Sequence, residues 1–130
     1  MSQPAIKILV VDDVQTIRMH VKEILRSTGY SFVKTASNGV EALKMLNEER
    51  FQLVISDWHM HPMDGLTLLK EVRAQAGLQP IAFIMLTADS TKEHVIQAIS
   101  SGVDDYVTKP FTVEHAQIKI PKALIRRKLL

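Results

Sequence analysis

The strongest constraint on the fold is an alternation of short apolar runs with segments of helical period. The runs, at residues 6–11, 32–36, 51–56, 81–86 and 106–107, are rich in β-branched and other apolar residues and predict five strands. Between them apolar residues recur at helical spacing, and a last helical segment begins at Thr112. Strands that alternate with helices run parallel and are covered on both faces. The alternation therefore predicts a doubly wound α/β sheet.

Local signals at the expected helix ends support this assignment. Asn38 and Asp64 stand where they can cap the second and third helices. Residues 90–93, Ser-Thr-Lys-Glu, have the spacing of a capping box and predict the start of the fourth helix. Gly29 and Gly102 follow the last periodic residues of two helices, where glycine commonly ends a helix.

Length and composition indicate one folded domain over residues 1–130. The chain is 46% apolar and 23% charged, which is ordinary for a globular protein, and it shows no internal repeat. It has no cysteine, which excludes disulfides and a thiolate nucleophile. Residues 1–4 lack the pattern of a signal peptide, and no stretch approaches the ~20 apolar residues of a membrane span. We therefore expect a cytoplasmic protein without membrane insertion.

The net charge of +2 comes from the last part of the chain, where five basic residues follow Glu114. This short basic tail is typical of a solvated helix face, with a docking surface as the alternative, and does not indicate a nucleic-acid partner. Pro121 falls inside the same segment, where proline removes a hydrogen bond and costs ~3 kcal/mol or more. We therefore expect residues 118–130 to form an atypical or kinked final helix, or to be rearranged or partly detached.

Polar residues follow the carboxyl ends of the predicted strands. Asp12 and Asp13 follow the first, Asp57 the third and Lys109 the fifth, and Thr87 ends the fourth. In open α/β sheets these ends meet at one rim, where ligands bind. Adjacent carboxylates repel one another unless a cation is present, and oxygen ligands beside an incoming phosphate suit Mg²⁺. Each residue alone could be a cap or a turn residue, but together they predict a magnesium and phosphate site.

Five motifs at these positions resemble the receiver domains of two-component response regulators. They are Val10-Val11-Asp12-Asp13, Ile55-Ser56-Asp57-Trp58, Met63-Asp64-Gly65, Met85-Leu86-Thr87-Ala88 and the segment Tyr106–Phe111. The resemblance covers essentially the whole chain and is strongest to the stand-alone chemotaxis regulators of the family. It implies a flavodoxin-like five-stranded parallel sheet in the order 2-1-3-4-5 with helices on both faces.

The resemblance also implies a role for each site residue. Asp57 is the phosphoacceptor, attacking a phosphohistidine of a partner histidine kinase. Asp13, Asp57 and the backbone carbonyl of His59 ligate Mg²⁺, and Asp12 holds the ion partly through water. Positioning and charge neutralisation dominate phosphoryl transfer, which agrees with these roles.

Further roles fall on the residues around the phosphoacceptor. Lys109 pairs with Asp57 and then with a phosphoryl oxygen, so Asp57, Lys109 and Thr87 carry the chemistry. Thr87 and the backbone amide of Ala88 bind the other phosphoryl oxygens. Movement of Thr87 makes room for the ring of Tyr106 to swing inward, which is the switch.

The sequence departs from the family at one proline, and two further residues are of interest. The family proline four residues after the phosphoacceptor is His61 here, and Pro62 comes one later, so we expect a different loop path and altered partner contacts. His59 and Asp89 stand where family members tune self-hydrolysis, so we expect them to set the lifetime of the phosphorylated state. The resemblance further implies a cis Lys109–Pro110 bond.

The sequence thus predicts a phosphoacceptor response regulator that acts by binding proteins and is not an enzyme beyond its own phosphorylation and dephosphorylation. Chemotaxis is the leading pathway, with a histidine kinase, a flagellar-motor switch protein and a phosphatase as partners. One alternative is a stand-alone receiver that acts in another phosphorelay or regulates a separate enzyme. A more remote alternative is a haloacid-dehalogenase-type phosphatase. The latter needs a second aspartate where His59 stands. A soft-metal site at His59-Met60-His61 is a weaker alternative.

Overall fold

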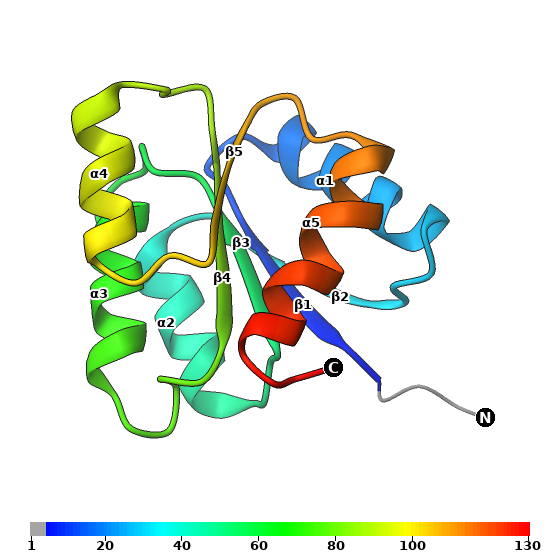
Figure 1. Ribbon diagram of the computed structural model, residues 1–130, viewed down its shortest axis with the longest axis horizontal. Helices are drawn as coiled ribbons and strands as arrows, with labels where there is room; N and C mark the ends of the chain where they lie inside the picture. Colours follow the sequence, from blue (N-terminus) through cyan, green and yellow to red (C-terminus); the bar gives the residue numbers. More distant parts are fainter. Residues whose placement is uncertain (1–4) are drawn as a thin grey trace.

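The five predicted strands form one parallel sheet in the order β2-β1-β3-β4-β5 (Figure 1). The computed structural model describes residues 5–130, so the prediction for residues 1–4 lies outside the described part. The flavodoxin-like order is confirmed. The strands are β1 (Lys7–Val11), β2 (Phe32–Ala36), β3 (Leu53–Ser56), β4 (Ala82–Thr87) and β5 (Asp105–Thr108).

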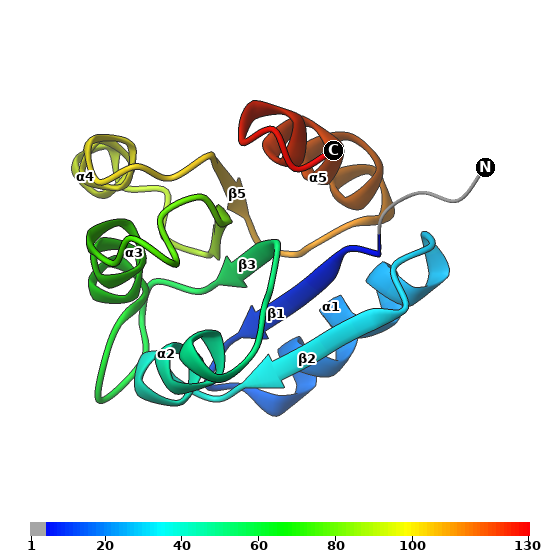
Figure 2. The ribbon, with the colours of Figure 1, turned by 90° about the horizontal axis from the view of Figure 1, so that it is seen from below.

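Helices cover both faces of the sheet, as the alternation predicts. They are α1 (Gln15–Ser27), α2 (Gly39–Glu48), α3 (Gly65–Ala74), α4 (Lys92–Ser100) and α5 (Val113–Arg126). Figure 2 shows α1 and α5 on one face and α2, α3 and α4 on the other. Two hydrophobic cores result, one under each helical layer. Every residue of β3 and β4 is buried, which explains why these runs carry almost no polar residue.

Most of the predicted helix ends are confirmed. The side chain of Asn38 accepts a hydrogen bond from the amide of Glu41 at 2.9 Å, and that of Asp64 accepts one from the amide of Thr67 at 2.8 Å. Gly29 and Gly102, with φ of 105° and 98°, follow α1 and α4 in the left-handed conformation that glycine adopts without strain.

The capping box predicted for residues 90–93 is wrong. Helix α4 begins one residue later than the box requires, with Thr91 as the N-cap and no capping bond from its side chain. Instead the carboxylate of Asp89 accepts a hydrogen bond from the amide of Thr91 at 2.9 Å. The amide is therefore satisfied from the preceding loop, and the side chain of Ser90 is not needed as a cap.

Pro121 lies within α5, which continues through it to Arg126. Burial explains why the helix does not end there, because Ile120 and Leu124 on either side are 0% exposed in the core. Each such side chain contributes about 1.5–3 kcal/mol, enough to offset the hydrogen bond that proline removes. The alternative of a partly detached end is therefore wrong for the residues from Pro121 to Leu124.

The basic tail is more than a solvated helix face. The carboxylate of Asp104, which is 0% exposed, contacts the guanidinium groups of Arg127 at 2.7 Å and Arg126 at 3.3 Å. It also contacts Arg73 of α3 at 3.0 Å and accepts a hydrogen bond from the backbone amide of Phe83 at 2.8 Å. Burial, followed by the charge of Arg127, lowers the pKa of Arg73 to about 10. Two of the tail's arginines therefore fasten the end of α5 to the sheet.

Within residues 5–130, none of the helices has the length and apolar character needed to span a bilayer.

Candidate functional site

The structure brings the polar residues of the strand ends together at one rim of the sheet. Asp12 and Asp57 extend the hydrogen-bonded ladder beyond β1 and β3, because the amide of Asp12 donates to Ala36 and that of Asp57 donates to Val11. The ammonium of Lys109, which follows β5, lies 2.8 Å from a carboxylate oxygen of Asp57 and 2.9 Å from one of Asp12. One cation therefore bridges two carboxylates from different strands.

Asp12, Asp13 and Asp57 form an acidic cluster in which one carboxylate oxygen from each residue lies within 4.8 Å of the others. Asp12 and Asp57 are buried, whereas Asp13 is exposed. Burial raises the pKa of Asp12, although Lys109 and the amide of Val14 oppose this effect. The cluster thus holds more carboxylate charge than Lys109 alone neutralises, with one member open to solvent.

Both the backbone and the side chain of Lys109 are hydrogen-bonded. Its backbone amide donates to the carbonyl of Thr87 at 3.0 Å, and its peptide bond to Pro110 is cis, as the resemblance implies. Burial disfavours its charge, but hydrogen bonds to Asp57 and Asp12 outweigh this, so its pKa is raised. Lys109 is therefore protonated at neutral pH.

Thr87 stands at the end of β4 with its side chain buried beside the acidic cluster. Its hydroxyl oxygen accepts a hydrogen bond from the amide of Asp89 at 3.2 Å. Ala88, between the two, is exposed. The hydroxyl of Thr87 thus controls the start of the loop between β4 and α4.

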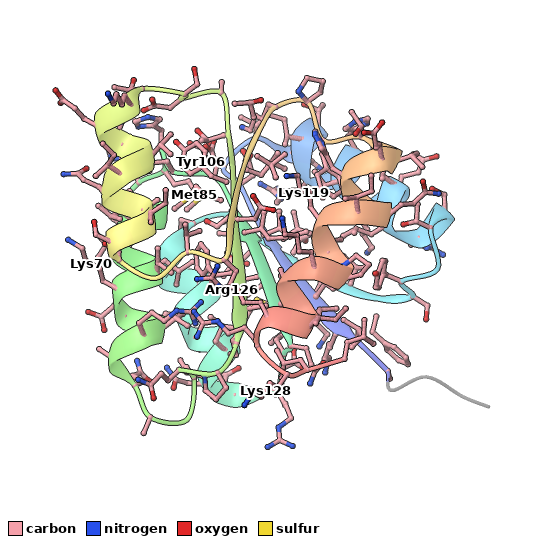
Figure 3. All side chains as sticks on the ribbon, in the orientation of Figure 1. Lys70, Met85, Tyr106, Lys119, Arg126 and Lys128 are labelled. Atoms are coloured by element: carbon pink, nitrogen blue, oxygen red, sulfur yellow. The ribbon has the colours of Figure 1, made fainter. Side chains whose placement is uncertain are left out.

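Tyr106 connects β5 to the same loop. In Figure 3 its side chain lies between β5 and α4, and its hydroxyl donates a hydrogen bond to the backbone carbonyl of Asp89. Burial raises the pKa of Tyr106 to about 12, with the charges of Asp89 and Asp57 adding to the effect. Thr87 and Tyr106 therefore both bind the backbone of Asp89.

The two residues that we expect to set the phosphoryl lifetime contact each other. A ring nitrogen of His59 lies 2.7 Å from the carboxylate of Asp89. Hydrogen bonds from Thr91 above all, and from the rings of His59 and His94, hold the pKa of Asp89 well below its usual range. Asp89 is therefore an anion at neutral pH.

The soft-metal site proposed for His59-Met60-His61 is wrong as a group of three. Met60 is 2% exposed and belongs to the hydrophobic core, so its sulfur faces away from the two exposed histidines on either side. His59 is instead linked to His94, because the rings of both histidines contact the carboxylate of Asp89. Sequence spacing could not reveal this pair, because His59 lies in the β3–α3 loop and His94 lies in the first turn of α4.

The motif Met63-Asp64-Gly65 packs against the backbone of the site and begins α3. The amide of Gly65 donates to the carbonyl of Trp58 at 2.8 Å, and any side chain at Gly65 would collide with the carbonyl oxygen of Asp57. Asp64 caps α3 immediately before it. The shifted Pro62 forms a cis bond with His61 within this loop.

Comparison of the sequence with protein families and with curated proteins gives consistent matches over most of the chain. The family described as the response regulator receiver domain matches residues 8–120. The chain is 40% identical over 120 residues to the chemotaxis protein CheY-3 of Vibrio cholerae serotype O1, covering 92% of each chain. It is 39% identical to the chemotaxis protein CheY of Pseudomonas aeruginosa, covering 92% of this chain and 97% of that protein.

Solved structures agree with the sequence comparison. The chemotaxis response regulator CheY4 of Vibrio cholerae superimposes with a TM-score of 0.85 at 33% identity, covering 93% of this chain and all of that one. The similarity therefore extends over both the fold and the rim that carries the acidic cluster, since residues 12–109 lie within the matched range of 8–120.

Proposed function

This chain belongs to the response regulator receiver family, and from that premise we propose that Asp57 is its phosphoacceptor. The observation that carries the proposal is the arrangement around one carboxylate. Asp57 is buried beside two further aspartates, and Lys109 contacts its Oδ2 atom at 2.8 Å. A carboxylate can accept a phosphoryl group only where the negative charges are neutralised, and this is the place on the rim where cation and carboxylates meet.

The acidic cluster fits the magnesium that receiver domains generally bind. Three carboxylates that offer oxygen atoms within 4.8 Å form the all-oxygen donor set that Mg²⁺ prefers, and exposed Asp13 leaves one side open to water. We assign Asp13, Asp57 and the backbone carbonyl of His59 as its ligands, with Asp12 acting partly through water. When bound, Mg²⁺ supplies positive charge that offsets the charge of the transferring phosphoryl group.

The chain's own residues account for the positioning. The Oδ1 atom of Asp57 accepts a hydrogen bond from the amide of Trp58 at 2.6 Å, while Oδ2 is held by Lys109. In the proposed transfer an Asp57 oxygen forms a bond to phosphorus, the phosphorus–nitrogen bond of the kinase phosphohistidine breaks, and the imidazole leaves with that electron pair. Lys109, the hydroxyl of Thr87 and the amide of Ala88 bind the phosphoryl oxygens.

The switch begins at Thr87. In the structure its hydroxyl oxygen accepts the Asp89 amide, and Tyr106 binds the Asp89 carbonyl. Once Thr87 turns to donate to a phosphoryl oxygen, the Asp89 amide loses that partner and the loop moves. The bond that holds Tyr106 is then lost and its ring turns inward, so a local change of charge reaches the surface.

As a receiver domain the chain is a signalling protein, and we propose that its chemistry is limited to its own phosphorylation and dephosphorylation. His59 and Asp89 set the lifetime, because they lie two residues after Asp57 and Thr87 respectively and their side chains contact each other at 2.7 Å. A haloacid-dehalogenase-type phosphatase is disfavoured, since the place of its acid is taken by His59, which is bound to Asp89.

The names of the curated relatives support chemotaxis as the pathway. The proposed partners are a histidine kinase, a phosphatase and a downstream target, with a flagellar-motor switch protein as the leading candidate. Ile96 and Ile99 on α4 are 54% and 63% exposed, which leaves an apolar surface on this helix for the target to bind. The site of action would be the cytoplasm, with residues 1–130 acting as one receiver domain.

Labelling with a small-molecule phosphodonor tests the proposal. In the presence of Mg²⁺ the chain should gain one base-labile phosphoryl group detectable by intact-mass spectrometry. Asp57→Ala should abolish the gain. Asp105→Ala is a matched control. Asp105 is the first residue of β5, at the opposite end of the strand from the rim that carries the acidic cluster, and it pairs with Lys119 at 3.5 Å. Labelling of Asp57→Ala at the level of the unmodified chain contradicts the assignment.

A further inference from the structure

A second group of metal-binding side chains lies beside the acidic cluster. It consists of His59 from the β3–α3 loop, Asp89 from the β4–α4 loop and His94 from the first turn of α4. The ring nitrogens of His59 and His94 both contact the Oδ2 atom of Asp89, the first at 2.7 Å. One nitrogen or oxygen atom from each residue lies within 4.8 Å of the other two.

Two of the three side chains are held in this arrangement by other contacts. The Oδ1 atom of Asp89 accepts the amide of Thr91 at 2.9 Å, which leaves Oδ2 facing the histidines. The ring of His94 stacks on buried Trp58 with the centroids 4.6 Å apart and the planes 23° apart. The positions of Asp89 and His94 are therefore fixed before an ion arrives, and the cost of ordering them is already met by the fold.

The group is also open to solvent on one side. The side chain of His59 is 60% exposed and that of His94 is 35% exposed, while Asp89 between them is 11% exposed. An ion can therefore enter from the side of His59. The same opening leaves room for water as a further ligand.

We propose that His59, Asp89 and His94 bind Zn²⁺. Two imidazole nitrogens and one carboxylate oxygen are ligands that zinc uses in proteins, with water in the fourth position of a tetrahedral site. Mg²⁺ prefers oxygen-only sites, so the nitrogen ligands distinguish this site from the acidic cluster next to it. Zinc would replace the two histidine–carboxylate hydrogen bonds with three coordinate bonds from the same atoms.

The site would act on the switch, an inference that rests on the proposed function. Asp89 contributes its carboxylate to the zinc site and its backbone carbonyl to the hydroxyl of Tyr106. Zinc would join the β3–α3 loop to the β4–α4 loop and α4, and would hold Asp89 where Tyr106 binds it. Zinc binding is therefore expected to oppose the movement that phosphorylation causes.

Calorimetric titration with Zn²⁺ tests binding directly. With Mg²⁺ in excess to occupy the acidic cluster, the unmodified chain should bind one Zn²⁺. His59→Gln and His94→Gln should each weaken binding by at least about tenfold, since even residues that only orient a ligand contribute about 10–100-fold to metal affinity. His61→Gln is the control, because this exposed histidine lies in the same loop but outside the group. Absence of saturable binding, or equal affinity in all four proteins, overturns the proposal.

A second measurement uses the chain's one tryptophan. Co²⁺ bound to His94 should quench the fluorescence of Trp58, which stacks on that ring, and His94→Gln should remove the saturable quenching. Quenching that persists in His94→Gln would place the ion elsewhere and contradict the proposal.

Asp57→Ala separates this proposal from the proposed function. That variant lacks a member of the acidic cluster and should still bind Zn²⁺ as the unmodified chain does. Loss of Zn²⁺ binding in Asp57→Ala would show that the ion occupies the acidic cluster, which refutes the second site. If Zn²⁺ binds but does not slow the phosphorylation-dependent change at Tyr106, the site stands and its effect on the switch is refuted.

Discussion

Replacement of Asp104 by Asn is expected to destabilise the protein strongly, although the residue lies far from the acidic cluster. Its carboxylate is 0% exposed and contacts Arg73 at 3.0 Å and Arg127 at 2.7 Å. Asn keeps the shape and can still accept the amide of Phe83, which Asp104 binds at 2.8 Å. The substitution therefore removes little but the negative charge and leaves two guanidinium groups facing each other.

The size of the effect follows from burial of the partners. Arg73 is 13% exposed and Arg127 24%, so water replaces the lost carboxylate poorly. At an effective dielectric constant of about 20, an ion pair at this distance is worth about 5 kcal/mol before the cost of desolvation. Breaking a buried pair by removing one partner costs about 3–5 kcal/mol, which is a large part of the roughly 5–15 kcal/mol that stabilises a domain.

Urea unfolding followed by circular dichroism measures this loss. With a denaturant slope of about 1–3 kcal/mol/M, a loss of about 3–5 kcal/mol should lower the midpoint by about 1–5 M while the slope stays unchanged. Arg126→Ala is the matched control. Arg126 is 64% exposed at 3.3 Å from Asp104, so its pair contributes at most about 1 kcal/mol. A midpoint shift in Asp104→Asn no larger than that in Arg126→Ala would refute the reasoning.

Three further predictions concern the site. Lys109→Ala should still bind Mg²⁺, seen as a change in tryptophan fluorescence, and should be phosphorylated without the change at Tyr106; an unaltered response at Tyr106 would contradict the role of Lys109. Tyr106 has a pKa raised from 10.0 to about 12 in the folded state, so its contribution to stability is complete below pH 10 and is lost as the pH rises towards 12. Unfolding measured across that range should show a steeper loss in the unmodified chain than in Tyr106→Phe, and parallel curves would exclude the effect. His59→Asn should speed loss of the phosphoryl group, because a smaller side chain two residues after Asp57 leaves more room for water near the phosphoryl group. An unchanged rate of dephosphorylation would show that His59 does not set the lifetime.

Much of the candidate site could be predicted from sequence because each member stands at the end of a strand. The ends of parallel strands meet at one rim, so the strand pattern alone brings Asp12, Asp57 and Lys109 together. The caps at Asn38 and Asp64 are equally local, since each side chain bonds an amide three residues away. The helix caps depend on residues that are near one another in the chain, and the site depends on the order of the strands. Both can be read from the sequence.

Other features depend on packing between distant elements. His59 and His94 meet at Asp89, and Arg73 meets Arg127 at Asp104, across separations that no motif spans. These contacts follow from how far each loop extends and where each helix lies on the sheet, which side-chain packing decides.

At Pro121 the local conformational preference and the tertiary packing conflict. Proline alone predicts a break, because it removes a backbone hydrogen bond from the helix. The structure continues α5 through it, because Ile120 and Leu124 bury their side chains completely on the sheet. The amino-acid sequence therefore determined the alternating elements and the charged rim, which follow from local pattern and strand order. Only the tertiary structure decided which distant side chains meet. It also decided that α5 continues through Pro121, because the free energy gained by burying apolar surface exceeds the cost of one missing hydrogen bond.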